Sequence, residues 1–148
     1  DVCSSDLSEI AKEEGLGLIK ICASLEEQLY ELTDDEKALF LDDYGIKESG
    51  LDKLIRASYD TLDLITYFTA GEKEVRAWTV KKGSLAPQAA GVIHTDFEKG
   101  FIKAEVIKYD DFLSLGSELK CKEAGKLSIE GKEYIVKDGD IMHFRFNV

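Results

Sequence analysis

The chain has little of what membrane-spanning and secreted proteins use. No apolar run approaches the roughly 18–20 residues that cross a bilayer. The N-terminus has no basic segment followed by an apolar one, as a secretory signal has. The three cysteines, Cys3, Cys22 and Cys121, are an odd number without a C-x-x-C pair, which excludes zinc sites of the usual spacing and favours reduced thiols. We therefore expect a cytoplasmic protein that has no membrane partner.

The sequence also lacks the G-x-x-x-x-G-K-[ST] motif, whose backbone N–H groups and lysine hold nucleotide phosphates. The nearest candidate, Gly125 followed by Gly131-Lys132-Glu133, has one residue too many and Glu in place of Ser or Thr, so a turn is the better interpretation. Asp138-Gly139-Asp140 begins like a calcium loop but lacks the later ligands. We expect this chain by itself to hold no cofactor and no metal, and to hydrolyse no triphosphate.

The acidic excess is confined to one half of the chain. The formal net charge is −11, and residues 1–64 hold 17 acids and 6 bases, while residues 65–148 hold 13 of each. This shift in composition suggests two structural units that meet near residue 64. The acidic half should repel nucleic acid phosphates, whereas the neutral half could present a local basic face.

Residues 1–64 are predicted to be mainly helical. The apolar run at 18–23 predicts a buried strand, in which Cys22 would be a small core residue. Capping boxes of the Ser/Thr-x-x-Glu type at 24–27 and 33–36 predict the starts of two helices. A third helix should begin at Ser49 and carry one apolar face. Without neighbouring strands such a segment exposes apolar surface, so we expect it to be the less stable half.

From Ile65 onward the pattern is that of strands. Residues 65–69 and 75–79 should pair as a hairpin, and Pro87 should open a helix that runs to about His94. The further elements expected are strands at 102–109, 134–136 and 141–146 and a short helix at 117–124. A hairpin, a helix and then three strands is the order of the ubiquitin-like β-grasp fold. The predicted class is therefore α+β, a β-grasp domain preceded by a mainly helical segment.

Three segments carry a resemblance to a known family: TYFTAG at 66–71, VRAWT at 75–79 and APQAAGVIHTDF at 86–97. With the closing segment 134–148 they resemble the C-terminal part of the YchF/Obg-like ATPases, which are P-loop proteins of the TRAFAC class that associate with ribosomes. The resemblance implies two domains. Residues 1–64 would be the end of the OBG-type nucleotide-binding domain, and residues 65–148 a TGS domain.

The resemblance also implies where an intact relative binds its nucleotide. The last strand of its nucleotide-binding domain and the following loop would border the base through Cys22, Ala23 and Ser24, with ATP and Mg as cofactors. The upstream nucleotide-binding domain would then be a partner of this chain. Residues 1–7 resemble a translated sequencing adapter, so we expect them to be non-native and the natural protein to continue upstream.

For residues 65–148 the resemblance implies the ribosome or its RNA as a partner, and no DNA. Phosphate contacts carry most nonspecific affinity, so the candidate contacts are basic: Arg76, Lys81, Lys82, Lys99, Lys103 and Arg145. A contiguous cationic face would favour RNA. Interspersed charges would favour the alternative, a ubiquitin-like protein-interaction or structural module without RNA contact. A third hypothesis, a small enzyme, needs His94 or His143 beside a thiol or a carboxylate.

Overall fold

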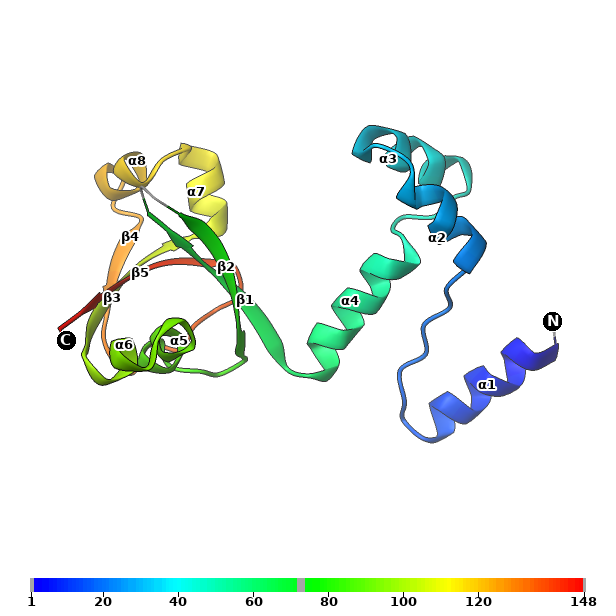
Figure 1. The fold of residues 1–148 in the computed structure, drawn as a ribbon, viewed down its shortest axis with the longest axis horizontal. Helices are drawn as coiled ribbons and strands as arrows, with labels where there is room; N and C mark the ends of the chain where they lie inside the picture. Colours follow the sequence, from blue (N-terminus) through cyan, green and yellow to red (C-terminus); the bar gives the residue numbers. More distant parts are fainter. Residues whose placement is uncertain (1, 72–73, 148) are drawn as a thin grey trace. The chain divides into compact units, whose positions relative to one another are not determined.

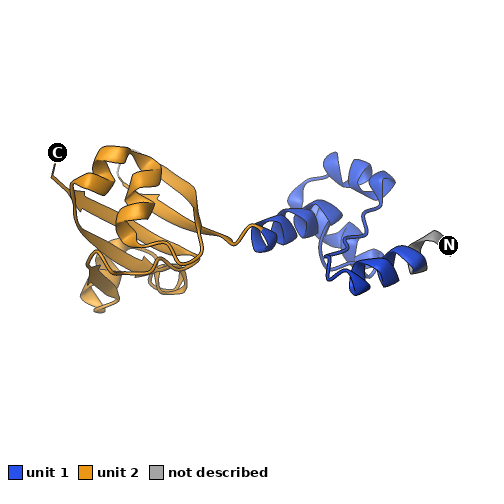
Figure 2. Cartoon of the chain, turned by 90° about the horizontal axis from the view of Figure 1, so that it is seen from below, with its two compact units in different colours: residues 1–61 blue, residues 62–148 orange. Residues whose placement is uncertain are grey.

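A computed structural model describes residues 2–71 and 74–147 (Figure 1). They form two compact units, residues 1–61, called unit 1, and residues 62–148, called unit 2 (Figure 2). Across the described ranges, no helix combines the length and the apolar character needed to cross a membrane.

Unit 1 consists of helices, and two of its predicted helix starts are confirmed. The helices are α1 (Val2–Glu13), α2 (Ala23–Tyr30), α3 (Asp34–Asp43) and α4 (Gly50–Thr61). The N–H of Thr33 donates to Glu36 Oε2 at 2.8 Å, which is one bond of the capping box before α3. At the start of α4, the N–H of Asp52 donates to Ser49 Oγ at 3.0 Å. Local sequence therefore sets these two helix starts.

The strand predicted at 18–23 is wrong, because residues 16–22 belong to no helix or strand. A strand needs a neighbour for its N–H and C=O groups, and the described part of unit 1 contains none. Cys22 is consequently exposed rather than part of a core. The capping box at 24–27 is wrong as well. Helix α2 begins at Ala23, and its N-cap, Cys22, makes no side-chain cap bond.

Glu26 instead joins α2 to the start of α4. Its carboxylate accepts the N–H of Gly50 at 2.6 Å and that of Leu51 at 3.3 Å. These are N–H groups that the first turn of a helix leaves without an internal partner. A Cβ at position 50 would lie 2.8 Å from Glu26 Oε1 and 3.0 Å from Ile21 Cγ2, so any larger residue here would displace the carboxylate that caps α4.

Unit 2 is a five-stranded sheet with helices on both faces, which confirms the predicted α+β class. The strands are β1 (Leu64–Ala70), β2 (Val75–Lys81), β3 (Phe101–Lys108), β4 (Leu127–Glu130) and β5 (Asp140–Phe146), in the order β2-β1-β5-β3-β4. Only the central β1–β5 pair is parallel. The helices are α5 (Ala86–Ile93), α6 (Thr95–Lys99), α7 (Tyr109–Leu115) and α8 (Glu118–Glu123). Figure 1 shows α5 and α6 on one face of the sheet and α7 and α8 on the other.

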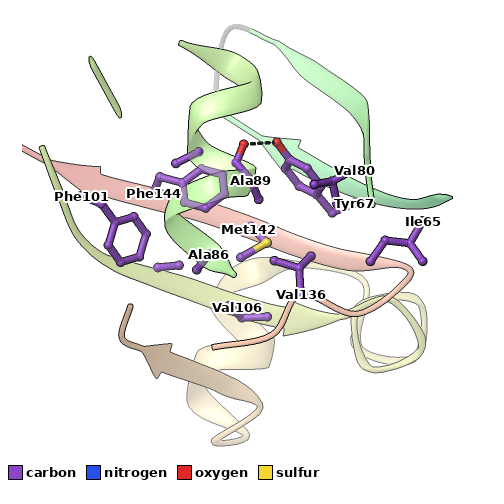
Figure 3. Packing of buried hydrophobic residues seen from close by; sticks show 12 residues of the cluster. Ile65, Tyr67, Val80, Ala86, Ala89, Phe101, Val106, Val136, Met142 and Phe144 are labelled. Atoms are coloured by element: carbon purple, nitrogen blue, oxygen red, sulfur yellow. Dashed lines mark hydrogen bonds between the residues drawn. The ribbon is translucent and has the colours of Figure 1, made fainter. Parts of the chain in front are cut away.

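The main core lies between the sheet and α5 (Figure 3). Tyr67 is fully buried there, and its hydroxyl donates to the carbonyl oxygen of Ala89 in α5 at 2.8 Å. Ala104 and Val106 of β3 face this core, while Ile107 faces the other side, as successive residues of a strand do.

A second, smaller cluster lies under α7 and α8. Its buried members are Ile107, Cys121 and Ile141, and Phe112 and Leu115 pack against them. The thiol of Cys121 lies 3.7 Å from the carbonyl oxygen of Asp111. Beyond these helices, Ile129, His143 and Arg145 on the same face of the sheet are exposed.

Two features of unit 2 differ from the predictions. The strand expected at 134–136 is a single bridge between Leu85 and Ile135, because the bonds on either side of it connect 84–86 to 134–136 and extend no further. Strand β4 and helices α6 and α7 were not predicted from the sequence. They are four to seven residues long, which is too short for a clear hydrophobic period. The turn expected at 70–73 lies partly outside the described residues.

Candidate functional site

The six basic residues proposed from the sequence do not form one surface. Arg76 lies on the α5 side of β2, where its guanidinium carbon is 4.2 Å from the centre of the Trp78 ring. Lys81 faces the opposite side, because its neighbour Val80 is in the core, and Lys82 directly follows β2. Lys99 ends α6.

The other two basic residues are neighbours on the face that α7 and α8 cover in part. Lys103 of β3 lies directly opposite Arg145 of β5. Three more side chains join them, because Glu105 lies opposite His143 on one side and Ile129 of β4 on the other. We call this set of five residues the outer patch.

The charges of the outer patch are mixed. Arg145 Nη2 lies 3.3 Å from Glu105 Oε2, and about half of the arginine side chain remains exposed. A pair with this exposure adds little to stability, so a phosphate could replace Glu105 as the partner of the guanidinium. Ile129 is 63% exposed in the same patch. The patch can therefore take an anionic group and an apolar group side by side.

The nucleotide residues proposed from the sequence belong to unit 1, whereas the outer patch belongs to unit 2. Cys22, Ala23 and Ser24 are exposed at the start of α2 in unit 1. Within the described residues, no group of three or more His, Cys, Asp or Glu side chains could hold a metal ion.

Of the groups that the enzyme hypothesis needs, a carboxylate does lie beside His94, with Nδ1 3.5 Å from Asp96 Oδ2, whereas the thiol of Cys121 belongs to a different cluster. His94 Nδ1 accepts the N–H of Asp96 at 3.2 Å and so caps α6, where a loop was expected. Phe97 stacks on Phe146 with ring centres 3.7 Å apart. Cys121 belongs to the cluster on the other face of the sheet, and Ser117 caps α8 through Lys120.

Asp140, in the segment that begins like a calcium loop, is a buried carboxylate. It is fully buried and accepts hydrogen bonds from Lys108 Nζ, from the Tyr134 hydroxyl at 2.7 Å and from the N–H of Lys137 at 2.9 Å. The group ties the end of β3 and the segment 134–137 to the start of β5. The sequence did contain one sign of this buried group: Lys108 is a charged residue on the side of β3 that faces the core.

Three groups in unit 2 have raised pKa values. Burial alone would lower the pKa of Lys108, but its bonds to Asp140 and Tyr134 outweigh burial and raise it. Burial raises the pKa of Tyr134, and its bond to Asp140 adds to this effect. Burial also raises the pKa of Tyr67. All three groups therefore hold their protons more tightly in the folded state than in the unfolded state.

We expect unit 2 to lose stability as the pH rises above about 10, where tyrosine and lysine of an unfolded chain begin to lose their protons. The contribution of the three groups is complete below that pH, because a raised pKa favours the folded state only while the group stays protonated. Urea unfolding at several pH values between pH 8 and pH 11, monitored by the fluorescence of the single tryptophan, Trp78, would measure this loss of stability as a fall in the unfolding midpoint. Tyr67→Phe should make the fall shallower, and a midpoint that stays constant over this range would contradict the assignment.

Comparison with known proteins identifies relatives of both units. The family model YchF-GTPase_C, described as a protein of unknown function (DUF933), matches residues 64–147. The chain is 61% identical over 140 residues to a protein of Pasteurella multocida and 57% identical over 142 residues to one of Bacillus subtilis, both named "Ribosome-binding ATPase YchF". These matches cover 95% and 96% of this chain but only 39% of each relative, so the chain spans about two fifths of their length.

Solved structures agree with this assignment. The Schizosaccharomyces pombe YchF GTPase superposes with a TM-score of 0.83 at 42% identity, over 95% of this chain and 38% of that protein. A GTP-binding protein of Pyrococcus horikoshii shares the fold, with a TM-score of 0.64 at 21% identity, over 97% of this chain and 41% of its own. This chain therefore belongs to the YchF family and corresponds to the C-terminal part of its members.

Proposed function

We propose that unit 2 is a TGS module by which a YchF-type protein docks on the ribosome, with the outer patch as the contact surface. Unit 1 would be the end of the nucleotide-binding domain, and ATP and Mg would be held by the part of a full-length protein outside this chain. The observation that supports the docking role most is the direct opposition of Lys103 and the exposed Arg145 on one face of the sheet.

The chemistry of the patch suits ribosomal RNA. Lysine and arginine supply point-charge and forked contacts to phosphate oxygens, and such contacts carry most of the affinity for nucleic acid. The relatives named above are ribosome-binding ATPases, which makes the ribosome the first partner to test. The acidic unit 1 would be kept away from the RNA by its own charge.

A second candidate is a ubiquitin-like module that contacts a protein and no RNA. Its support is that the basic side chains are interspersed with acids. Arg145 lies 3.3 Å from Glu105, and Arg76 lies 3.9 Å from Glu74. The exposed Ile129 in the outer patch would serve a protein contact equally well.

Salt dependence separates the two candidates. Cosedimentation with purified bacterial ribosomes would measure the affinity of the chain at salt concentrations from roughly 50 to 300 mM, a range over which phosphate contacts weaken. Replacing Lys103 and Arg145 together by glutamine should weaken binding by about tenfold and reduce the log–log salt slope by about 1.5, since two phosphate contacts are lost. Lys99→Gln, on the α6 side, removes a charge outside the patch and should leave both quantities unchanged.

Binding that is strong but insensitive to salt would favour the protein-contact candidate. If the double variant binds as the unchanged chain does, the outer patch is not the contact surface.

A further inference from the structure

Strand β2 is the longer of the two edges of the sheet in unit 2. It spans seven residues, whereas β4 at the other edge spans four, and within the described residues no strand lies beyond either of them. Its pairing with β1 is regular at all seven positions, and it contains no proline. Proteins often protect an edge strand by making it short or by adding a proline or a bulge. Because β2 uses none of these devices, its outer side can accept a further strand.

The hydrogen bonds of the hairpin show which backbone groups of β2 turn outward. The N–H of Lys82 donates to the carbonyl oxygen of Asp63 at 2.7 Å, in the same register as the pairs of β1 and β2. Bonded and non-bonded pairs alternate along an antiparallel ladder. Val75 and Ala77 therefore direct their N–H and C=O groups away from β1. Both residues are exposed, so a strand could reach these groups.

This edge is not an unfilled part of a core. The β2 side chains on the α5 side, Trp78 and Val80, already pack in the main core. The family model spans residues 64–147, so β2 lies well inside the part of unit 2 that the family shares. What β2 leaves open is a row of backbone groups, which a further strand can pair without any change in the core.

The charged side chains along β2 are mostly basic. Arg76, Lys81 and Lys82 are exposed, and Glu74 is the one acid in residues 74–82. Lys81 and Lys82 form no ion pair with any described residue. Arg76 lies 3.9 Å from Glu74, and both side chains are more than half exposed, so this pair is weak and can exchange partners. The edge therefore attracts an acidic strand and repels a basic one.

We propose that the outer edge of β2 binds an extended acidic segment of a partner protein, which adds a sixth strand to the sheet. In this mode of recognition main-chain hydrogen bonds supply affinity, and the side chains beside them supply specificity. Val75 and Ala77 offer the backbone groups. Carboxylates of the segment would meet Arg76 on one face of the sheet and Lys81 on the other.

The same features argue against two other occupants. A second copy of the chain would bring three bases and one acid against an identical set of charges. RNA could pair with the basic side chains, but it has no row of donors and acceptors at the spacing of a strand. The inference concerns a surface other than the outer patch and does not depend on ribosome docking.

The first test compares three fluorescent peptides of about 12 residues, enough to span one strand and its flanks, by their anisotropy with the full chain. The first consists of valine, threonine and glutamate, the second has lysine in place of every glutamate, and the third is the glutamate peptide with methylated backbone nitrogens. The glutamate peptide should bind at least about tenfold more tightly than the lysine peptide, because like charges repel. It should also bind at least about tenfold more tightly than the methylated peptide, whose backbone cannot donate.

Variants locate the site. Ala77→Pro removes an outward N–H, which edge strands tolerate, and should weaken binding of the glutamate peptide by about tenfold or more. Replacing Lys81 and Lys82 together by glutamate should have an effect of about the same size through charge. The matched control replaces Lys120 and Lys122, which are exposed on α8, by glutamate, and should change the affinity by less than about twofold. Far-UV circular dichroism would check that each variant folds.

Hydrogen exchange would detect the added strand directly. Amides in residues 75–81 should exchange at least a few fold more slowly with the glutamate peptide bound, because outward N–H groups gain partners. The full-length relative from Bacillus subtilis should bind the same peptide, since the edge is expected to stay open in the whole protein.

Several results would overturn the proposal. Equal affinity for the lysine peptide would remove the charge preference, and equal affinity for the methylated peptide would mean attraction by charge alone. Unchanged affinity in both Ala77→Pro and the Lys81/Lys82 double variant would place the site elsewhere. A dimer that Ala77→Pro dissociates would assign the edge to a second copy, and displacement of the peptide by an RNA oligonucleotide would assign it to RNA. If the full-length relative does not bind the peptide, another part of the same protein covers the edge.

Discussion

Replacing Tyr67 by alanine is expected to destabilise unit 2 by about 3–5 kcal/mol, the range for removing a large buried aromatic ring. Tyr67 is fully buried in the middle of the main core, between β1 and α5. Its ring meets the ring of Phe144 edge-on, with centres 6.0 Å apart, and its hydroxyl bonds to Ala89. Because domains are stable by only about 5–15 kcal/mol, this loss removes a large part of the total.

Urea unfolding followed by the fluorescence of Trp78 would measure the loss, since the only tryptophan lies in unit 2. Tyr67→Phe is the matched control. It keeps the ring and removes only the hydroxyl, so it should cost about 0.5–1.5 kcal/mol. If the free energy of unfolding of the alanine variant lies within about 1 kcal/mol of that of the unsubstituted chain, the packing between β1 and α5 is not the source of stability.

Backbone amides in unit 1 are expected to exchange at least about 100-fold faster than those in β1, β3 and β5 of unit 2, a difference of about 2.7 kcal/mol in opening free energy. Leu29 is the one buried apolar side chain among the described residues of unit 1, whereas unit 2 has two buried clusters. Few buried apolar contacts mean that local opening exposes little new surface and therefore costs little free energy.

Hydrogen exchange read by mass spectrometry would resolve the two units peptide by peptide. Peptides from 50–61 and 64–70 give the sharpest comparison, because α4 and β1 are adjacent in sequence but belong to different units. Equal protection on both sides of residue 61 would contradict the expectation. It would mean that unit 1 gains stability from something other than its own core.

Patterns within one element were predicted well from the sequence. The capping box at Thr33 and the strand at 102–109 depend on residues a few positions apart, so the local chain contains the whole signal. The order of a hairpin, a helix and three more strands then indicated the β-grasp class, and the sheet order of unit 2 agrees with it. The strand predicted at 134–136 is wrong, because the pairing of an apolar run depends on a segment that is distant in sequence. Here that segment is 84–86, which contributes only one bridge.

By itself the sequence determined the family, the α+β class and the acidic character of residues 1–64, since composition and local spacing are properties of the chain alone. Only the tertiary structure decided which side chains meet. It divided the predicted basic residues between opposite sides of unit 2, paired Lys103 with Arg145, and gathered Lys108 and Tyr134 around Asp140. It also left residues 18–23 without a strand. The physical reason is the same throughout: a strand, a charge pair and a buried carboxylate each need partners that are distant in sequence, and strand register sets which of them come together.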